Sequence, residues 1–215
     1  MKFVLKYFLI CLMSRVKFFQ PKALGMLGEA MVEFHFWMGF NSRYELLNDV
    51  TIKLRNGGTT QLDHLILSPY GIFVIETKNY KGIIKGTVDD LKWKQTIGNR
   101  TYEFYNPIKQ NESHSRVVKG IVSGILPAYH VHNIVVFTKR SKHKRGWFGF
   151  GAKLPEHVHF GYSWVRYVKK FSKKVLSQQQ LEEIRSRIDH RTLDKGMITN
   201  AKHVFNVKFR NFRKR

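Results

Sequence analysis

Residues 61–78, which read QLDHLILSPYGIFVIETK, constrain the fold more than any other part of the chain. Two runs of aliphatic and β-branched residues flank the sequence Ser-Pro-Tyr-Gly at 68–71. Proline fixes φ at the second position of a turn and glycine suits the fourth, so this pattern predicts a β-hairpin. Charged residues interrupt both strands: Asp63 the first, Glu76 and Lys78 the second. A charge in a buried strand is costly unless it is paired or bound to a metal, so these three positions are candidate site residues.

The register of the hairpin decides whether the three charges meet. With a two-residue turn, Asp63 lies opposite Glu76. Directly opposite residues lie on one face with Cβ atoms roughly 4.5–5.5 Å apart, and Glu76 and Lys78 share a face because strands alternate with a period of two. A turn with a glycine bulge would instead pair Asp63 with Thr77 and turn its carboxylate to the other face. The residues leave both registers open.

Two neighbouring carboxylates repel each other and do not both stay ionised without a cation. Mg²⁺ prefers hard oxygen ligands and is usually held by one or two carboxylates together with water and phosphate. Asp63 and Glu76 are therefore candidate ligands of Mg²⁺ or Mn²⁺, and the Thr77 carbonyl is a candidate third ligand. Lys78 would hold or deprotonate the attacking water and offset charge on a phosphorane-like transition state. The alternative is a buried carboxylate–lysine pair with a purely structural role.

The order Asp63, then Glu76-Thr77-Lys78, resembles the Asp…(Asp/Glu)-x-Lys signature of the PD-(D/E)XK nuclease superfamily, although Leu62 stands where a proline usually precedes the aspartate. More closely, the chain resembles the nuclease-related domain (NERD) family within that superfamily. The matching motifs, in the family's order, are Gly28-Glu29, Gln61-Leu62-Asp63-His64, Ser68-Pro69, Gly71 to Tyr80, Gly82, Trp93 and Asn106-Pro107-Ile108 with Gln110. This resemblance implies an α/β fold with a restriction-endonuclease-like core, in which α-helices flank a mixed central β-sheet. It also implies metal-dependent hydrolysis of DNA phosphodiester bonds, as in an Mg²⁺-dependent (endo)deoxyribonuclease.

A first helix is predicted over residues 21–38, because its apolar residues recur at spacings of three and four. The face expected to pack on the sheet or on a neighbouring element carries Leu24, Leu27, Met31, Phe34 and Met38. Glu29 lies on the opposite stripe with Gly25, Val32 and Phe36. By resemblance to the family, Glu29 is the acidic residue that a helix directs toward the metal site.

A second helix is predicted to begin at Asn106-Pro107, which suit an N-cap and a first helical position, and to continue to about residue 125. Gln110 heads a stripe that includes His114, Val117 and Ile121. Gln110 resembles the glutamine that supports the catalytic face in this family and would orient water or Lys78; its alternative role is to cap a sheet edge. The strand expected at 134–137 follows this helix, which predicts that it runs parallel to the 72–75 strand. The predicted catalytic residues are Asp63, Glu76, Lys78, Glu29 and Gln110.

Charge points to a polyanionic partner. The chain has 38 lysines and arginines against 15 acidic residues, a formal charge of +23, which favours nucleic acid first and an anionic membrane second. Cys11 is the single cysteine, so the chain forms no intrachain disulfide, and we expect a cytoplasmic, reducing location with or without attachment to a membrane. The expected nucleic-acid-binding residues are Lys81, Lys85, Lys139, Arg140, Lys142, Lys144, Arg145, Arg210 and Arg213.

Four segments are expected. Residues 1–20 are apolar and basic, and either lie on a membrane surface or pack on the domain; residues 21–138 form the nuclease-like core. Residues 139–195 combine a basic, aromatic-tipped loop with C-terminal helices packed on the core, and residues 196–215 form a basic tail. Two alternatives to a nuclease follow from these features: a non-catalytic nucleic-acid-binding protein with a nuclease-like fold, and a basic protein associated with a membrane surface.

Overall fold

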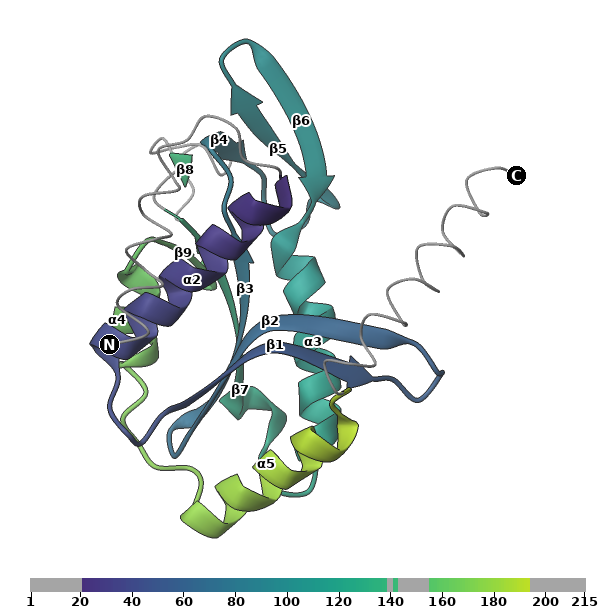
Figure 1. The fold of residues 1–215 in the computed structure, drawn as a ribbon, viewed down its shortest axis with the longest axis vertical. Helices are drawn as coiled ribbons and strands as arrows, with labels where there is room; N and C mark the ends of the chain where they lie inside the picture. The colour runs from purple at the N-terminus through teal and green to yellow at the C-terminus, as the bar shows by residue number, and fades with distance from the viewer. Residues whose placement is uncertain (1–20, 139–140, 143–154, 194–215) are drawn as a thin grey trace.

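The computed structural model describes residues 21–138, 141–142 and 155–193. Its central sheet has five strands in the order β1-β2-β3-β7-β9 (Figure 1). These strands are β1 (Glu45–Lys53), β2 (Thr59–Ser68), β3 (Gly71–Lys78), β7 (Val131–Phe137) and β9 (Val158–Phe160). β1, β2 and β3 are antiparallel, whereas β7 and β9 run parallel to β3, so the predicted mixed sheet is confirmed, as is the parallel orientation of β7.

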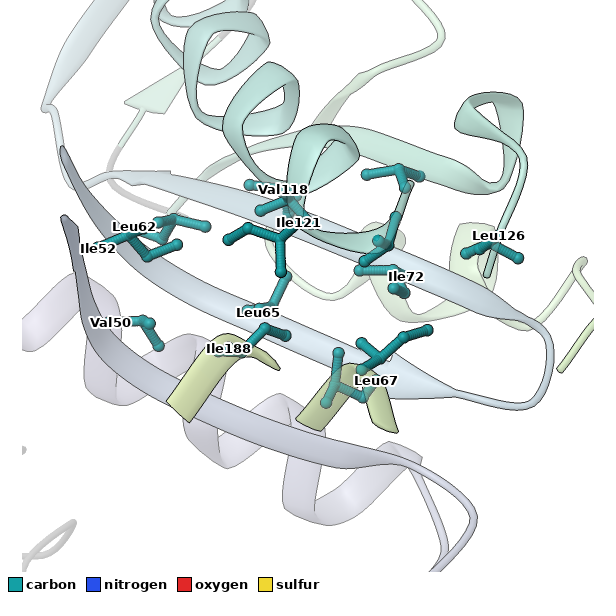
Figure 2. Close-up of a cluster of buried hydrophobic side chains, with 14 of the residues drawn as sticks. Val50, Ile52, Leu62, Leu65, Leu67, Ile72, Val118, Ile121, Leu126 and Ile188 are labelled. Atoms are coloured by element: carbon teal, nitrogen blue, oxygen red, sulfur yellow. The ribbon is translucent and has the colours of Figure 1, made fainter. Parts of the chain in front are cut away.

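Helices cover both faces of this sheet. They are α2 (Pro21–Gly39), α3 (Pro107–Val122), α4 (Ser163–Val168) and α5 (Gln178–Arg191), and a short 3₁₀ helix, η1 (Ala128–His130), precedes β7. α3 and α5 pack on one face, where Leu65, Ile72 and Ile121 are fully or almost fully buried (Figure 2). α2 and α4 pack on the other, against Phe73 and Ile75. The layered α/β fold expected from the sequence is therefore confirmed.

The hairpin between β2 and β3 has the two-residue turn. Ser68 pairs with Gly71, and the ladder continues to His64 opposite Ile75. The Ser68 hydroxyl accepts a hydrogen bond from the Tyr70 amide at 3.2 Å and donates one to the Gly71 carbonyl at 2.9 Å, which fixes the turn. The bulged register is therefore wrong, and the ladder ends at His64 opposite Ile75, one residue before Asp63 and Glu76.

A second sheet has four strands. Its order is β6-β5-β4-β8, formed by β4 (Gly82–Lys85), β5 (Lys92–Ile97), β6 (Arg100–Tyr105) and β8 (Ser141–Lys142). Of these, β4, β5 and β6 lie between β3 and α3 in the chain, whereas β8 follows β7. One face packs through Ile84 and Trp93 on Ile108 of α3 and Phe137 of β7. Trp93 is fully buried and its Nε1 donates to the Thr87 carbonyl at 2.8 Å, so it is a core anchor.

Asn106 ties this second sheet to α3. Its Oδ1 accepts from the Ile108 amide at 2.9 Å, the cap expected from the sequence. Its Nδ2 donates to the carbonyls of Thr87, Val88 and Asp90 at 2.7–3.2 Å, so one buried side chain both begins the helix and holds the β4–β5 connection.

The sheet-facing stripe of α2 differs from the expected one. The buried positions are Gly28, Val32, His35 and Gly39, whereas Met38 is 53% exposed. The sequence prediction chose the stripe with the bulkier apolar side chains. The helix lies close to the sheet, however, and the small residue Gly28 permits that close approach. The stripe that carries Val32, and with it the neighbouring Glu29, therefore faces inward.

α3 also presents a different stripe. Its buried side includes Ile108, Asn111, Ser115 and Val118, and the helix ends at Val122, earlier than expected. Asn111 donates to the Val74 carbonyl at 2.8 Å and the Ile134 carbonyl at 3.0 Å, so a polar residue joins α3 to β3 and β7. Gln110 and His114 lie at the margin of this stripe, half-buried.

Among the described residues, no helix is long and apolar enough to cross a bilayer.

Candidate active site

Asp63 lies where β2 and β3 part. The main-chain ladder ends at His64 opposite Ile75, and beyond it Oδ2 of Asp63 accepts a hydrogen bond from the Thr77 amide at 2.8 Å. Leu62 and Leu65 both belong to the core beneath α3 and α5, although they are three residues apart on one strand. Side chains of a regular strand alternate between the two faces of the sheet, so the alternation of β2 is interrupted between Leu62 and Leu65, at Asp63, which has no partner in the ladder with β1. The strand geometry therefore directs a carboxylate toward the carboxyl end of β3.

Glu76 and Lys78 form a buried ion pair at that end. Nζ of Lys78 lies 2.7 Å from Oε1 of Glu76, and the two side chains are 15% and 4% exposed. The same ammonium donates to Oε1 of Gln110 at 3.0 Å. Alternation on β3 turns both residues toward α3, and the first turn of α3 brings Gln110 over them. The structure thus brings together four of the predicted residues, and Gln110 contacts Lys78 directly.

His114 belongs to the same cluster and was not among the predicted site residues. Its Nε2 lies 3.5 Å from Oε2 of Glu76, which is within ion-pair range but without hydrogen-bond geometry. Its Nδ1 lies 2.8 Å from the Thr60 hydroxyl of β2. The signal for His114 was its place one helical turn after Gln110, where residues four apart share a face. Nothing in the sequence pattern marks Thr60.

Gly28 brings α2, and therefore Glu29, toward the site. A Cβ atom at Gly28 would lie 2.7 Å from Cβ of Asn79 and 3.2 Å from Cγ2 of Thr77, so only glycine permits this approach. The side-chain Nδ2 of Asn79 donates to the Leu24 carbonyl, which ties the helix to the end of β3. Glu29 is close enough for its charge to raise the pKa of Asp63. The Gly-Glu pair noted in the sequence thus has a geometric basis.

The two carboxyl groups titrate differently. Burial, followed by repulsion from Glu76, raises the pKa of Asp63 to about 7, although the Thr77 amide opposes the shift. Burial alone would raise the pKa of Glu76 as well, but His114 and Lys78 outweigh it and lower that pKa below the ordinary value. The charge and hydrogen bond of Glu76 likewise overcome the effect of burial on Lys78 and raise its pKa. At neutral pH the pair is an ionised Glu76 and an ammonium, beside a partly protonated Asp63.

These donors suit a hard divalent cation. A cation beside Asp63 would favour the ionised carboxylate, and so would lower the pKa that burial and Glu76 raise. The described residues contain no cluster of three or more His, Cys, Asp or Glu side chains able to hold a metal ion. A cation here would therefore rely on two carboxylates and take further ligands from the main chain, water or phosphate, as Mg²⁺ commonly does.

The expected nucleic-acid-binding residues are described only in part. Lys81 and Lys85 are exposed, after β3 and at the end of β4. Lys142 lies in β8, which pairs with β4. The remaining predicted residues, Lys139, Arg140, Lys144, Arg145, Arg210 and Arg213, lie outside the described ranges, as do the predicted N-terminal segment and basic tail.

Comparison with known proteins agrees with this geometry. The family model of the nuclease-related domain matches residues 24–138, more than half of the chain, and the chain belongs to this family. The family lies within the PD-(D/E)XK-like nuclease superfamily. The matched region contains every predicted catalytic residue.

One curated relative gives a further comparison. It is a Bacillus anthracis protein described as uncharacterized, 37% identical over 119 residues that make up 55% of this chain and 56% of the relative. The chain thus spans about half the length of the curated relative it matches. No solved structure matches the chain significantly.

Proposed function

We propose that the protein is a metal-dependent nuclease that hydrolyses DNA phosphodiester bonds at the cluster of Asp63, Glu76 and Lys78. The observation that carries this proposal is the convergence of two electrostatically coupled carboxyl groups and one ammonium where β2 and β3 part. The formal charge of +23 suits a polyanionic substrate. Membership of a nuclease-related family supports the reaction class.

Each residue has a distinct proposed role. Asp63, Glu76 and the Thr77 carbonyl would hold Mg²⁺ or Mn²⁺, which when bound would polarise the scissile phosphate and acidify a water molecule. The raised pKa of Lys78 favours a protonated side chain, which holds the attacking water and offsets transition-state charge rather than removing a proton. Gln110 fixes the Lys78 ammonium through their 3.0 Å hydrogen bond. Glu29 adds negative charge near Asp63 and so strengthens attraction for a cation.

A plasmid-nicking assay tests the proposal. Purified protein is incubated with supercoiled plasmid across a titration of Mg²⁺ and, separately, Mn²⁺, with EDTA as the control. The expected result is conversion to nicked and linear forms that depends on the metal and stops in EDTA. Absence of cleavage with both metals would contradict the proposed activity.

The same experiment separates the two rival functions. A non-catalytic binder would retard DNA equally with and without EDTA and would never nick it. A membrane-surface protein would sediment with anionic liposomes, and deletion of residues 1–20 would abolish that sedimentation.

A further inference from the structure

The exposed side of the second sheet forms a basic surface that the candidate active site does not use. Because the strands alternate, the side opposite Trp93 carries a set of residues that we call the lysine face. Its members are Ile83, Lys85, Lys92, Lys94, Thr96, Thr101, Glu103 and Tyr105. All are exposed except Ile83 and Thr96, which are half-buried.

Cations outnumber carboxylates on the lysine face. Lys85 pairs directly across the strands with Lys94, an arrangement of like charges that weakens a sheet. Glu103 is the single acidic member of the face; it lies opposite Lys94, and Nζ of Lys92 lies 3.4 Å from its Oε2. Both side chains of this ion pair are more than half exposed, so solvent screens it and it stabilises the sheet little. A bound polyanion would interact favourably with Lys92 and Lys94.

Three further members, Thr96, Thr101 and Tyr105, carry hydroxyl groups. The hydroxyls of Thr96 and Thr101 lie 3.2 Å apart on neighbouring strands. Tyr105 is 48% exposed and lies opposite Lys92. Ammonium, hydroxyl and phenol donors are the kinds of side chain that bind the nucleic-acid backbone without reading its bases.

The lysine face is held firmly beside the candidate active site. Its strands β4, β5 and β6 lie in the chain between Lys78, at the end of β3, and Gln110, in the first turn of α3. Figure 1 shows the β5–β6 hairpin standing above the N-terminal end of α3. Asn106 fastens this sheet to the helix through its contacts with three carbonyls and the Ile108 amide. Backbone bound on this face would therefore keep a fixed relation to the residues that act on the phosphate.

We propose that the lysine face binds the sugar-phosphate backbone of duplex DNA outside the cleavage point, and so holds the substrate in the active site. This role rests on the nuclease function proposed above. It assigns Lys92, Lys94, Thr96, Thr101 and Tyr105 to the DNA-binding surface, in addition to Lys85.

Binding of a fluorescein-labelled duplex to the full chain, measured by anisotropy in EDTA, tests this surface without cleavage. The test variant is Lys92→Ala with Lys94→Ala. Its charge-matched control is Lys173→Ala with Lys174→Ala, two exposed lysines in the linker that leads into α5, at the end of the molecule far from the hairpin (Figure 1). The test variant should bind at least about tenfold more weakly near 0.1 M salt, with a salt dependence shallower by about two phosphate contacts. The control should change affinity by no more than about twofold, because charges beyond a Debye length are largely screened.

Glu103→Gln provides a test in the opposite direction. Removing the acidic member of the face should tighten DNA binding several-fold, which damage to folding would not do. Equal loss in the test and control variants, or unchanged binding by Glu103→Gln, would overturn the assignment even if wild type binds and cleaves DNA. If wild type binds DNA through Lys92 and Lys94 but shows no metal-dependent cleavage, the DNA-binding role of the lysine face is supported and the proposed nuclease activity is contradicted. If binding to anionic vesicles required Lys92 and Lys94 but binding to DNA did not, the lysine face would be a membrane-binding surface and the proposed DNA-binding role would be overturned.

Discussion

Nζ of Lys78 lies 2.7 Å from Oε1 of Glu76 in a buried ion pair, beside the point where Asp63 leaves the β2–β3 ladder. This pair has a structural as well as a proposed catalytic role, because neither charge is compensated by bulk water. Lys78→Met should lower the free energy of unfolding by roughly 3 kcal/mol, since it leaves a buried carboxylate without its partner. Urea denaturation at pH 7 measures the change. The double variant Glu76→Gln with Lys78→Met should lose less than Lys78→Met alone; simple addition of the two single effects would show that the pair is not coupled.

Stability of the metal-free protein should depend on the ionisation of Asp63. Its pKa is about 7 in the folded chain, above the unfolded value of about 3.9, so the folded state binds this proton more tightly. The resulting stabilisation is complete below pH 4 and is lost as pH rises to about 7, by roughly 2–4 kcal/mol. Glu76, whose folded pKa is lowered, acts in the opposite sense and loses its contribution only as pH falls below the ordinary glutamate range. Asp63→Asn should remove the loss between pH 4 and pH 7; an unchanged pH profile in thermal unfolding would contradict the assignment.

Gly28 and Gly25 should respond oppositely to alanine. Both lie in α2, where alanine normally stabilises a helix by roughly 0.5–1 kcal/mol relative to glycine. At Gly25 no described atom lies within 4 Å of a new Cβ, so Gly25→Ala should stabilise the protein by about that amount. At Gly28 the new Cβ would meet Asn79 at 2.7 Å, so Gly28→Ala should destabilise it by roughly 1–3 kcal/mol. Stabilisation by both substitutions would show that α2 does not need this close approach.

Asn106 should matter more than an ordinary helix cap. Asn106→Ala removes an N-cap and the donors to three main-chain carbonyls of the β4–β5 connection, and should cost roughly 2–4 kcal/mol. Ser177→Ala in α5 is the matched control, because Ser177 caps through Gln180 and lacks those additional contacts; it should cost about 1 kcal/mol. Chemical denaturation of the two variants compares them directly, and equal losses would show that the contacts of Asn106 with the β4–β5 connection contribute nothing.

The hairpin was predictable because its turn chemistry and its charges are local in sequence. Ser68 to Gly71 specify the turn, and the turn fixes the register of the ladder as far as His64 opposite Ile75. The sequence alone left a bulged register open, since Gly71 tolerates either geometry. The Ser68 hydroxyl, which bonds to both the Tyr70 amide and the Gly71 carbonyl, distinguishes them only in the folded chain.

Features set by long-range packing were not predictable. The inward stripe of α2 follows from the close approach at Gly28, which a hydrophobic count does not detect. Asn111 is buried because main-chain carbonyls of β3 and β7 accept its amide, whereas sequence patterns treat asparagine as a surface residue. His114 joined the site through Thr60, more than fifty positions away in the chain. Motif spacing thus located the carboxylates and Lys78, and tertiary contacts supplied the groups that hold them.

Cleavage by Asp63→Asn tests the central claim most directly, because this substitution keeps the size of the side chain and removes its charge. Supercoiled plasmid is incubated with wild type and with Asp63→Asn at equal concentration and saturating Mg²⁺, after circular dichroism has shown both to be folded. We predict metal-dependent nicking by wild type and a loss of at least about a hundredfold in the variant, because one of the two carboxylates proposed to bind the cation is gone. Nicking by Asp63→Asn at the wild-type rate would contradict the account.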